Sequence, residues 1–515
     1  MKSGLLLLAS LFIFSAPGSA ASLPETIVVY PDRIICNNYI GVGVQWSAYP
    51  HGDSDDSEWG LLMTDEKWEM LYDRLDRMKP RFIRVIDQAN WRYFKGLDSD
   101  GNPILSFENQ QTRALFRILD YCQRHAITVL IGEWGVPGGM HDPNDPSVRL
   151  MSTSDMRWIG MIGEWMAYLI NEKGYTCIRY YDFVNEPNGD WACTDGNFAE
   201  WALGVKLLHE EFESRGLADR IAVSGPGTVP QMSHARYRDK YVGRDWPLYA
   251  SQVLRKELGS YNTHAYFNHD VIRKGRAAEY VHLTADVAIA DREGKPFLLG
   301  EVGIKATTEP EKSEHLRRMK ADGNSSDDSN MFVYDYSYGV EMASAALQSL
   351  LAGVDGMAAW DLDDAMHTKG DTGDKTQMKR WGFWNILGTE LHGNPADENI
   401  RPWYYAWSWL CRFMPAGTLL LGSDQPGNPG CQLLAARTDD DYTFYAVNTS
   451  DRDEEFLLKG DLPRMTLNRL TYNESFAART PPYEVKAPVR ADFGKGLRLR
   501  VPAKTFLVLT TQEPK

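Results

Sequence analysis

Residues 178–187 have the sequence IRYYDFVNEP, an apolar run that ends in Asn185-Glu186-Pro187. A second apolar run, residues 296–300 (PFLLG), is followed by Glu301. Both runs are typical of buried strands in a parallel sheet, because they are short, apolar and bounded by polar or turn-forming residues. In a barrel of parallel strands the carboxyl ends of the strands carry the chemistry. Two strands that each end in a glutamate therefore predict a site with a pair of carboxylates.

Strand and helix patterns alternate around these two runs, from about residue 38 to residue 412. The expected strands cover residues 40–46, 82–86, 128–132, 178–184, 221–224, 261–266, 296–300 and 356–360. The expected helices cover residues 65–78, 109–125, 155–173, 197–215, a segment that ends near 258, 275–293, 339–351 and 402–413. Because eight strand–helix units are what a (β/α)8 TIM barrel requires, the expected fold class is α/β.

The pattern changes after Pro415, where short alternating runs are separated by turn residues. Such runs predict an all-β sandwich of about 100 residues. We therefore expect a catalytic barrel over residues 38–414 and a C-terminal all-β sandwich domain over residues 415–515. Residues 22–37 are expected to contain an N-terminal strand that could join the sandwich.

The first 21 residues are organised like a secretion signal. Lys2 supplies a positive charge, residues 4–14 are apolar, and Gly18-Ser19-Ala20 offers small residues before a cleavage site. The apolar run is too short to span a bilayer. We expect residues 1–21 to be a signal peptide, the mature protein to be secreted or periplasmic, and the chain to have no membrane span.

Composition excludes some partners and favours others. The chain of 515 residues has a formal net charge of −15, which together with the lack of a basic stripe argues against nucleic acid. Its 16 Trp and 25 Tyr fit a carbohydrate partner, because aromatic faces stack on sugar rings, although a large barrel also buries many aromatics for packing alone. Six cysteines without a C-x-x-C pattern leave both disulfides and buried thiols open, and the oligomeric state stays unknown.

A pair of facing carboxyl groups is what cleavage of a glycosidic bond needs. Retaining glycosidases hold the two groups about 5–5.5 Å apart; one protonates the leaving oxygen and the other attacks the anomeric carbon. Glu186 and Glu301 are distant in sequence, but a barrel brings its fourth and seventh strands to opposite sides of one mouth. The acid has to carry a proton at working pH, whereas the nucleophile has to be ionised.

With these residues in place, the chain resembles clan A of the glycoside hydrolases, the 4/7 superfamily of retaining enzymes. Asn185-Glu186-Pro187 after the fourth strand is similar to the acid/base motif of the clan, and Glu301 after the seventh strand to its nucleophile. Arg84 is similar to the arginine that steadies the nucleophile, and His264-Ala265-Tyr266 to the His-x-Tyr element. Trp360 is similar to the tryptophan beneath the attacked sugar. No family within the clan is assigned.

The resemblance implies a secreted retaining O-glycoside hydrolase that cleaves β-linked (equatorial) bonds of oligo- or polysaccharides by double displacement. Its catalytic residues would be Glu186 and Glu301, and it would need neither a cofactor nor a metal. The implied substrate-binding residues are Arg84, Asn185, His264, Tyr266 and Trp360. Asn185 would bond the sugar 2-hydroxyl, and Arg84 and Tyr266 would donate to Glu301.

Glu133 and Trp134, at the end of the third strand, are also expected substrate contacts, with a structural role equally open. Simpler explanations exist for the other residues: an ion pair with Asp87 or Asp182 for Arg84, and packing for the ring side chains. The aspartates at the end of the last strand could bind sugar hydroxyls or cap backbone groups: Asp361, Asp363 and Asp364.

Alternative functions remain open at this stage. One is a non-catalytic carbohydrate-binding barrel, against which the retention of both glutamates argues. A transglycosylase would carry the same residues. A barrel lyase that uses a metal or a Schiff base is a third class. The sequence shows no zinc or EF-hand spacing. No lysine follows directly on an expected strand, which argues against a Schiff base.

Overall fold

The structure is a computed structural model. It describes residues 24–51, 58–137, 141–142, 145–149, 152–194, 196–366, 377–478 and 486–514. The expected signal peptide, residues 1–21, lies outside the described residues.

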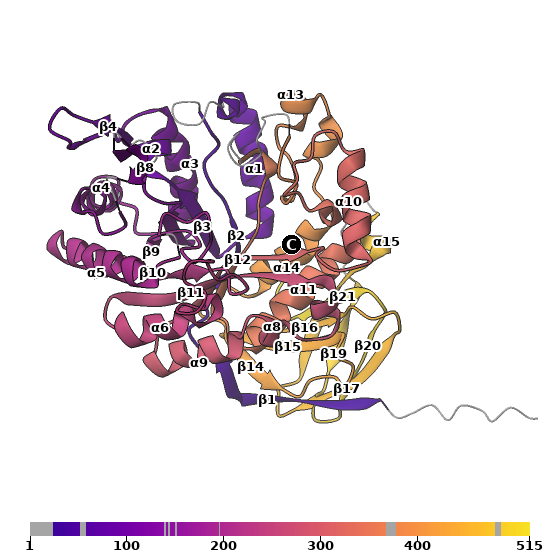
Figure 1. Ribbon diagram of the computed structural model, residues 1–515. Coiled ribbons are helices and arrows are strands. Elements are labelled where there is room, and N and C mark those ends of the chain that lie inside the picture. Colours follow the sequence, from indigo (N-terminus) through magenta and orange to yellow (C-terminus); the bar gives the residue numbers. More distant parts are fainter. Residues whose placement is uncertain are drawn as a thin grey trace, which may run out of the picture.

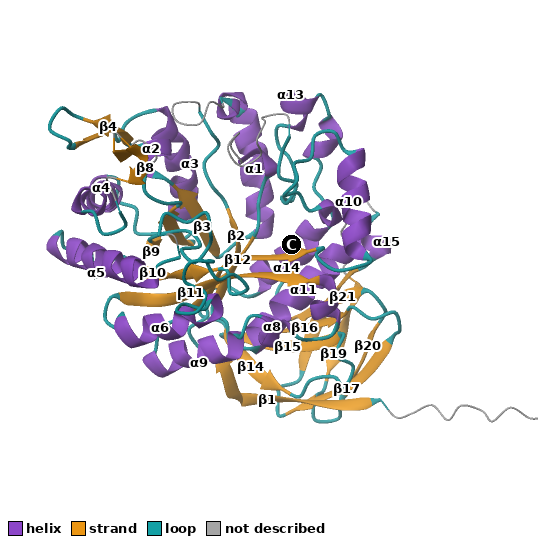
Figure 2. Ribbon diagram, in the orientation of Figure 1, coloured by secondary structure: helices purple, strands orange, loops and turns teal. Residues whose placement is uncertain are grey.

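Eight parallel strands form a closed barrel, in the order β10-β11-β12-β13-β2-β3-β6-β9, which confirms the expected fold class (Figures 1 and 2). The strands are β2 (Gly41–Gln45), β3 (Phe82–Asp87), β6 (Thr128–Glu133), β9 (Ile178–Asp182), β10 (Ala222–Thr228), β11 (Leu258–Asn268), β12 (Phe297–Lys305) and β13 (Gly356–Ala359). They read as apolar runs rather than alternating ones because both faces of a barrel strand are covered. In β12, for example, eight of nine residues are buried.

Helices surround the barrel. Those that follow its strands in turn are α1 (Asp65–Met78), α3 (Gln110–Arg124), α4 (Met156–Ala167), α5 (Phe198–Ser214), α6 (Trp246–Val253), α9 (Leu283–Glu293), α11 (Tyr336–Leu351) and α14 (Trp403–Phe413). Further helices lie in other connections: α2 (Ala89–Arg92), α7 (His269–Arg273), α8 (Ala277–Tyr280), α10 (Glu311–Ala321), α13 (Gly388–His392) and α15 (Glu474–Ala477). Two hairpins complete the loops: β4 (Phe94–Leu97) with β5 (Pro103–Leu105), and β7 (His141–Asp142) with β8 (Asp145–Arg149).

Some element boundaries differ from those the sequence predicts. The strand expected to end at Gly300 continues to Lys305, so Glu301 lies within β12 rather than after it. β11 begins at Leu258, where a helix was expected to end. The single helix expected over residues 275–293 is two helices, α8 and α9, separated at His282, whose φ of 55° breaks the helical path.

Side chains fill the interior of the barrel towards the amino ends of its strands. Phe82, Leu130, Leu298 and Ala358 come from four different strands and form one buried cluster. Inward-pointing layers of this kind make the barrel a packed core rather than a pore. Polar chemistry is therefore confined to the carboxyl ends of the strands.

The C-terminal residues and the N-terminal strand form one nine-stranded sheet, in the order β19-β18-β21-β16-β15-β14-β1-β17-β20. β1 (Glu25–Cys36) pairs antiparallel with β14 and parallel with β17. The other strands are β14 (Leu419–Ser423), β15 (Cys431–Thr438), β16 (Asp441–Asn448), β17 (Glu454–Gly460), β18 (Met465–Tyr472), β19 (Lys486–Ala491), β20 (Leu497–Val501) and β21 (Thr505–Thr510). The sheet curls so that β20 contacts β16 and β21, and a second hydrophobic cluster fills the space between.

The outer face of this sheet packs on barrel helices α11 and α14 (Figure 1). Along β16, Phe444 and Ala446 face the core of the sheet domain, whereas Tyr445 and Val447 join the core of the barrel. This alternation is the two-residue period of a strand. The Tyr472 hydroxyl donates to the Tyr336 carbonyl oxygen across the boundary at 2.9 Å.

Among the described residues, no helix combines the length and the apolar character needed to cross a bilayer.

Several cysteines are buried free thiols: Cys36, Cys122, Cys177, Cys411 and Cys431. Burial raises the pKa of the Cys177 thiol to about 12, so this thiol stays protonated at neutral pH.

Candidate active site

The backbone after β9 aims Glu186 into the mouth of the barrel. The Asn185 amide donates to the Glu133 carbonyl at 2.9 Å, and the Glu186 amide donates to the Gly227 carbonyl at 3.2 Å. The segment is thus held between the neighbouring strands β6 and β10. Glu186 has a φ of 49°, in the left-handed region that non-glycine residues seldom adopt. Strain of this kind persists where surrounding bonds fix it, and it gathers at functional sites.

A local irregularity in β12 positions Glu301. The register of β12 shifts against β11 between Thr263 and His264, and against β13 between Leu299 and Val302. The Gly300 amide donates to the side-chain oxygen of Asn262 at 2.9 Å. A Cβ at Gly300 would lie 2.7 Å from that oxygen, so this approach requires glycine. Such shifts re-aim side chains.

The two glutamates meet at the mouth, bridged by His264. Its Nδ1 lies 2.8 Å from Glu186 Oε1 and 3.6 Å from Glu301 Oε1. This nitrogen and one oxygen of each glutamate all lie within 4.8 Å of one another. The carboxyl groups of retaining glycosidases are about 5–5.5 Å apart, whereas those of inverting enzymes are about 6.5–9.5 Å apart. The limit of 4.8 Å on the distance between one oxygen of each glutamate is shorter than the inverting range.

Glu301 is surrounded by groups that stabilise its ionised form. Arg84 Nη1 donates to Oε1 at 2.6 Å, and the Tyr266 hydroxyl donates to Oε2 at 2.5 Å. Burial alone would raise the pKa of Glu301, but the charges of His264 and Arg84 and the bond from Tyr266 bring it below its ordinary value. The carboxylate is therefore ionised through the mildly acidic range.

Arg84 also orients Asn185. Its Nη2 donates to Asn185 Oδ1 at 2.6 Å and lies 3.5 Å from Asp182 Oδ2. Because the Asn185 oxygen is bound to Arg84, its amide NH2 is the group available to a ligand in the cavity. Burial raises the pKa of Asp182 to about 6, and Asn262 donates to this carboxyl at 3.1 Å.

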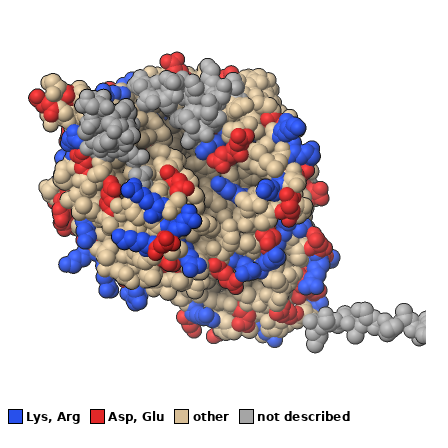
Figure 3. Space-filling model, viewed as in Figure 1, with Lys and Arg blue, Asp and Glu red and all other residues tan. Residues whose placement is uncertain are grey.

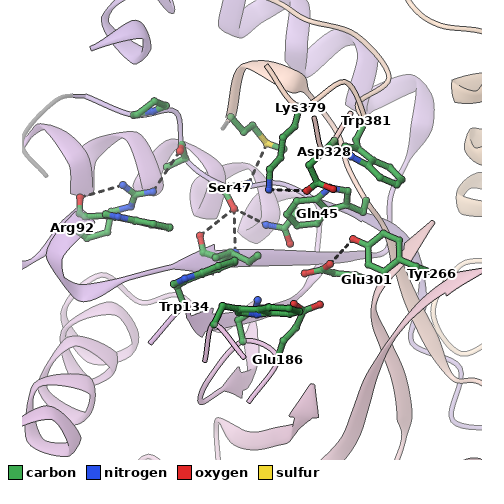
Figure 4. A pocket seen from close by; sticks show the side chains of 18 of the residues that line it. Gln45, Ser47, Arg92, Trp134, Glu186, Tyr266, Glu301, Asp328, Lys379 and Trp381 are labelled. Carbon is green, nitrogen blue, oxygen red and sulfur yellow. Dashed lines mark hydrogen bonds and ion pairs between the residues drawn. The ribbon is translucent and has the colours of Figure 1, made fainter. Parts of the chain in front are cut away.

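A cavity of about 400 Å³ opens above the two glutamates (Figure 4). It is lined by Gln45, Ser47, Ala48, Pro50, Ile86, Trp91, Arg92, Trp134, Asn185, Glu186, Trp191, Tyr266, Glu301, Lys305, Asp328, Trp360, Met366, Lys379 and Trp381. In Figure 4, Trp134 and Arg92 lie on one side, and Tyr266, Trp381, Asp328 and Lys379 on the other. On the face shown in Figure 3, charges of both signs are interspersed around a hollow of mostly uncharged residues.

Aromatic rings supply most of the apolar wall. Ile86, Trp360 and Trp381 form a buried cluster against which Trp91, Trp134 and Tyr266 pack. A cavity with apolar rings and a few polar groups is the usual form of a small-molecule site. Sugars fit such walls, because their C–H faces stack on rings while their hydroxyls reach polar groups.

The structure brings most of the sequence-predicted residues together. Six of them line the cavity: Asn185, Glu186, Tyr266, Glu301, Trp360 and Trp134. Arg84 and His264 do not line it; they are buried beneath it and contact the two carboxylates. Glu133 does not line the cavity. The aspartates Asp363 and Asp364 hold backbone amides: Asp363 accepts from Ala365 and Ile386, and Asp364 accepts from Trp381 and Gly382.

Sequence reasoning did not identify several cavity residues: Trp91, Trp191, Lys305, Asp328 and Lys379. Four of these lie outside the barrel strands, where no periodicity marks them. Gln45 could have been found, since it ends the first barrel strand. Lys305 was missed because β12 was expected to stop five residues earlier.

Glu133 is a buried strand-end glutamate that supports the fold. Its two oxygens accept from the Ala89 amide and from the Tyr93 hydroxyl, each at 2.9 Å. Burial, together with the charge of nearby Asp87, raises the pKa of Glu133 to about 8. The folded protein therefore holds this proton through a range in which the unfolded chain releases it.

This proton gives a first testable prediction, on stability. An acid whose folded pKa is raised loses stabilisation as pH rises from its unfolded pKa, 4.5, to its folded pKa, about 8. We expect Glu133→Gln to remove this pH dependence of the free energy of unfolding. Relative to the wild type, the free energy of unfolding of the variant should therefore rise by roughly 3 kcal/mol between pH 5 and pH 8. Urea unfolding of both proteins at the two pH values measures it. A pH-independent difference would refute the assigned protonation.

The Glu186–His264–Glu301 cluster has donor atoms close enough for a metal ion. Its surroundings disfavour that use, since the Arg84 guanidinium already contacts one Glu301 oxygen and the Tyr266 hydroxyl contacts the other. A cation would meet the positive charge of Arg84 at close range.

Lys305 changes the argument about a Schiff base, because the structure does place a strand-end lysine in the cavity. A Schiff-base lysine has to be desolvated or set beside another cation to become nucleophilic. The Lys305 side chain is instead 40% exposed, and its ammonium lies 3.9 Å from Asp328. The amine is therefore in contact with solvent rather than desolvated.

No protein-family model matches the chain, and no curated protein matches it. The chain shares its fold with solved GH30 and GH39 structures over nearly its whole length. One is a GH30 endoxylanase from Clostridium papyrosolvens C71, with 11% identity, a TM-score of 0.58 and coverage of 95% of this chain and 100% of that one. A GH39 β-xylosidase from Caulobacter crescentus has 14% identity, a TM-score of 0.57 and the same coverage. A conserved exported protein from Bacteroides fragilis has 12% identity, a TM-score of 0.63 and coverage of 94% and 100%.

Proposed function

We propose that the protein is a retaining O-glycoside hydrolase that cleaves β-linked (equatorial) glycosidic bonds. One observation carries the proposal: carboxylate oxygens of Glu186 and Glu301 lie within 4.8 Å of each other at the mouth of the barrel. Their surroundings differ in the sense that double displacement needs. Glu301 is buried among donors that hold it ionised, whereas Glu186 lies on the cavity wall with its side chain 13% exposed.

The reaction takes two steps. In the first, the Glu301 carboxylate attacks the anomeric carbon, the bond to the leaving oxygen breaks, and Glu186 gives its proton to that oxygen. In the second, Glu186 takes a proton from water, the water oxygen attacks the same carbon, and the ester to Glu301 breaks. His264 positions Glu186 through its ring nitrogen Nδ1. The side-chain NH2 of Asn185 can bond the sugar 2-hydroxyl.

The size and walls of the cavity favour a short stretch of sugar. A volume of about 400 Å³ is near the lower end for ligand sites and suits one or two sugar rings. The GH30 and GH39 structures that share the fold include an endoxylanase and a β-xylosidase, so xylose-containing glycosides are the first to test. Residues 1–21 support a location outside the cytoplasm, where polysaccharides are met.

Trp191 is placed to bind the leaving group. It lines the cavity five residues after Glu186, and the residue is 46% exposed. Its loop is tied to the acid, since the Gly189 amide donates to the Glu186 carbonyl at 2.9 Å. A Cβ at Gly189 would lie 2.5 Å from the Trp191 ring, so the glycine makes room for this ring position.

We expect Trp191→Ala to lower kcat/KM on oligosaccharides by roughly ten- to fiftyfold, because an exposed ring that a sugar covers contributes apolar contact. The loss should be smaller on aryl glycosides with good leaving groups, whose departure needs less help. Gly189→Ala, which displaces the ring without removing it, should also lower kcat/KM more on oligosaccharides than on aryl glycosides. Equal losses on both substrate types would show that Trp191 only supports the fold.

A screen of aryl β-glycosides, xylo-oligosaccharides and polysaccharides tests the proposal, with the anomer of the first product followed by NMR. We expect the β anomer to form first and to mutarotate afterwards. An α-anomeric first product would refute the retaining mechanism. Product analysis with added acceptor sugars separates a transglycosylase, and binding without turnover of any substrate would indicate a carbohydrate-binding barrel.

A further inference from the structure

Lys305 extends from the same strand as the proposed nucleophile. Residues 301, 303 and 305 of a strand point to the same side. Residue 303 is Gly, and a Cβ there would lie 3.0 Å from the Tyr266 ring and 3.1 Å from the Trp381 ring. Glycine thus lets the two rings close the space between Glu301 and Lys305. The Lys305 ammonium lies over the Tyr266 ring, 4.4 Å from its centroid, and 5.7 Å from that of Trp381.

The Tyr266 ring links the ammonium to the reaction centre. Its hydroxyl donates to Glu301 Oε2, so only one ring separates Lys305 from the nucleophile. A substituent on the sugar that Glu301 attacks, or on the next sugar, is within reach of Lys305. The side chain is 40% exposed and lines the cavity, so a ligand can approach it.

A second lysine of the cavity wall, Lys379, lies beside Asp328 (Figure 4). Asp328 stands between the two: its Oδ1 is 3.9 Å from Lys305 Nζ, and its Oδ2 is 3.2 Å from Lys379 Nζ. Both ammonium groups thus lie beside the Asp328 carboxylate. The 3.9 Å separation is too long for a hydrogen bond, so the N–H donors of Lys305 are not used by Asp328.

Other bonds already hold the Asp328 loop in place. Trp381 Nε1 donates to the Asp328 carbonyl oxygen at 2.5 Å. Ser329 Oγ donates to the Met378 carbonyl at 2.9 Å and accepts from the Arg380 amide at 3.1 Å. These bonds fix the loop through backbone groups, so the two lysines are not needed to anchor it.

We propose that Lys305 and Lys379 form a subsite for an anionic group on the sugar, a carboxylate or a sulfate ester, and that Asp328 occupies them when no such ligand is bound. The inference rests on the proposed function in one respect, that the ligand is a sugar. An acidic sugar brings its charge to the N–H donors of Lys305. Charge-assisted bonds of this kind are about twice as strong as neutral ones.

Binding of matched pairs by NMR titration tests the subsite without relying on turnover. The probes are methyl β-D-glucuronide with methyl β-D-glucoside, the corresponding galacto pair, and methyl 6-sulfo-β-D-glucoside, at 20 and 200 mM NaCl. In at least one pair we expect the acid to bind about tenfold more tightly than its neutral partner, and less so at high salt. The sulfated probe shows whether carboxylate or sulfate is preferred.

Two variants should change the ratio of the affinity for the acidic sugar to that for the neutral sugar in opposite directions. Lys305→Met should reduce the ratio about tenfold, whereas Asp328→Asn should raise it about threefold, because it removes the competing carboxylate. Lys274→Met, which removes a lysine that pairs with Asp270 on α7, is the matched control and should leave the ratio unchanged.

Two results would overturn the subsite: no preference for the acid in either pair, or a ratio that falls in Asp328→Asn as it does in Lys305→Met. The second result would mean that the three residues act only as a structural ion-pair cluster. Hydrolysis of aryl glycosides is measured in parallel. A charge preference without turnover would uphold the subsite and refute the proposed function, and turnover without a charge preference would do the reverse.

Discussion

Replacing Glu301 by Gln should reduce kcat by roughly 10⁴-fold or more, the scale of loss when the nucleophile of a covalent mechanism is removed. Gln has the same shape but no charge, so no glycosyl ester can form. Arg84 would lose its ion pair with residue 301, yet it keeps Asp182 and Asn185 as partners. The variant should therefore still fold, as a circular-dichroism spectrum and cooperative unfolding would show.

Glu133→Gln is the matched control for this experiment. It makes the same chemical change at another buried glutamate, the last residue of β6, which does not line the cavity. We expect its kcat to stay within about threefold of the wild type, since its contacts are with Ala89 and Tyr93. Wild-type turnover in Glu301→Gln, or an equal loss in both variants, would remove Glu301 from the nucleophile role.

Replacing Glu186 by Ala should have a different signature, which depends on the leaving group. For substrates with poor leaving groups, kcat/KM should fall by about 10²–10⁴-fold, because no proton reaches the departing oxygen. For dinitrophenyl glycosides the first step needs no acid, so the ester on Glu301 should accumulate. Added azide should then raise kcat by about tenfold or more and yield the β-glycosyl azide, because it attacks the ester without a general base.

The anomer of the azide product carries this test. A β-azide requires two inversions at the same carbon, first by Glu301 and then by azide. An α-azide would mean that azide attacks the substrate of Glu186→Ala directly, and it would refute the covalent step. Azide should produce no β-glycosyl azide with Glu301→Gln, because that variant forms no ester.

The positions of the paired glutamates could be predicted because each follows a run of apolar residues that only a buried strand explains. The same reasoning fails to separate Glu133 from them. Glu133 also ends a buried strand, but its oxygens turn toward Ala89 and Tyr93 instead of the mouth. The direction of a strand-end side chain depends on local register and on φ, as at Glu186 and in the irregular part of β12, and neither can be seen in a hydrophobic pattern.

The rest of the site depends on contacts between distant segments. Asp328 and Lys379 come from two separate loops and meet only because hydrogen bonds join those loops. Trp191 is recognisable as a cavity residue only once the turn after Glu186 is known. The sheet domain was easier to predict, since alternating residues such as Phe444 and Tyr445 mark a strand covered on both faces.

The position of β1 has a consequence for how the chain is made. This strand is synthesised long before its neighbours β14 and β17, which lie more than 380 residues later in the sequence. During synthesis both edges of β1 must wait unpaired while the barrel is assembled, and an unpaired edge invites association with other chains. The barrel helices α11 and α14 likewise await the sheet that covers them. A barrel truncated before the C-terminal strands should therefore aggregate during expression instead of accumulating as a smaller folded protein.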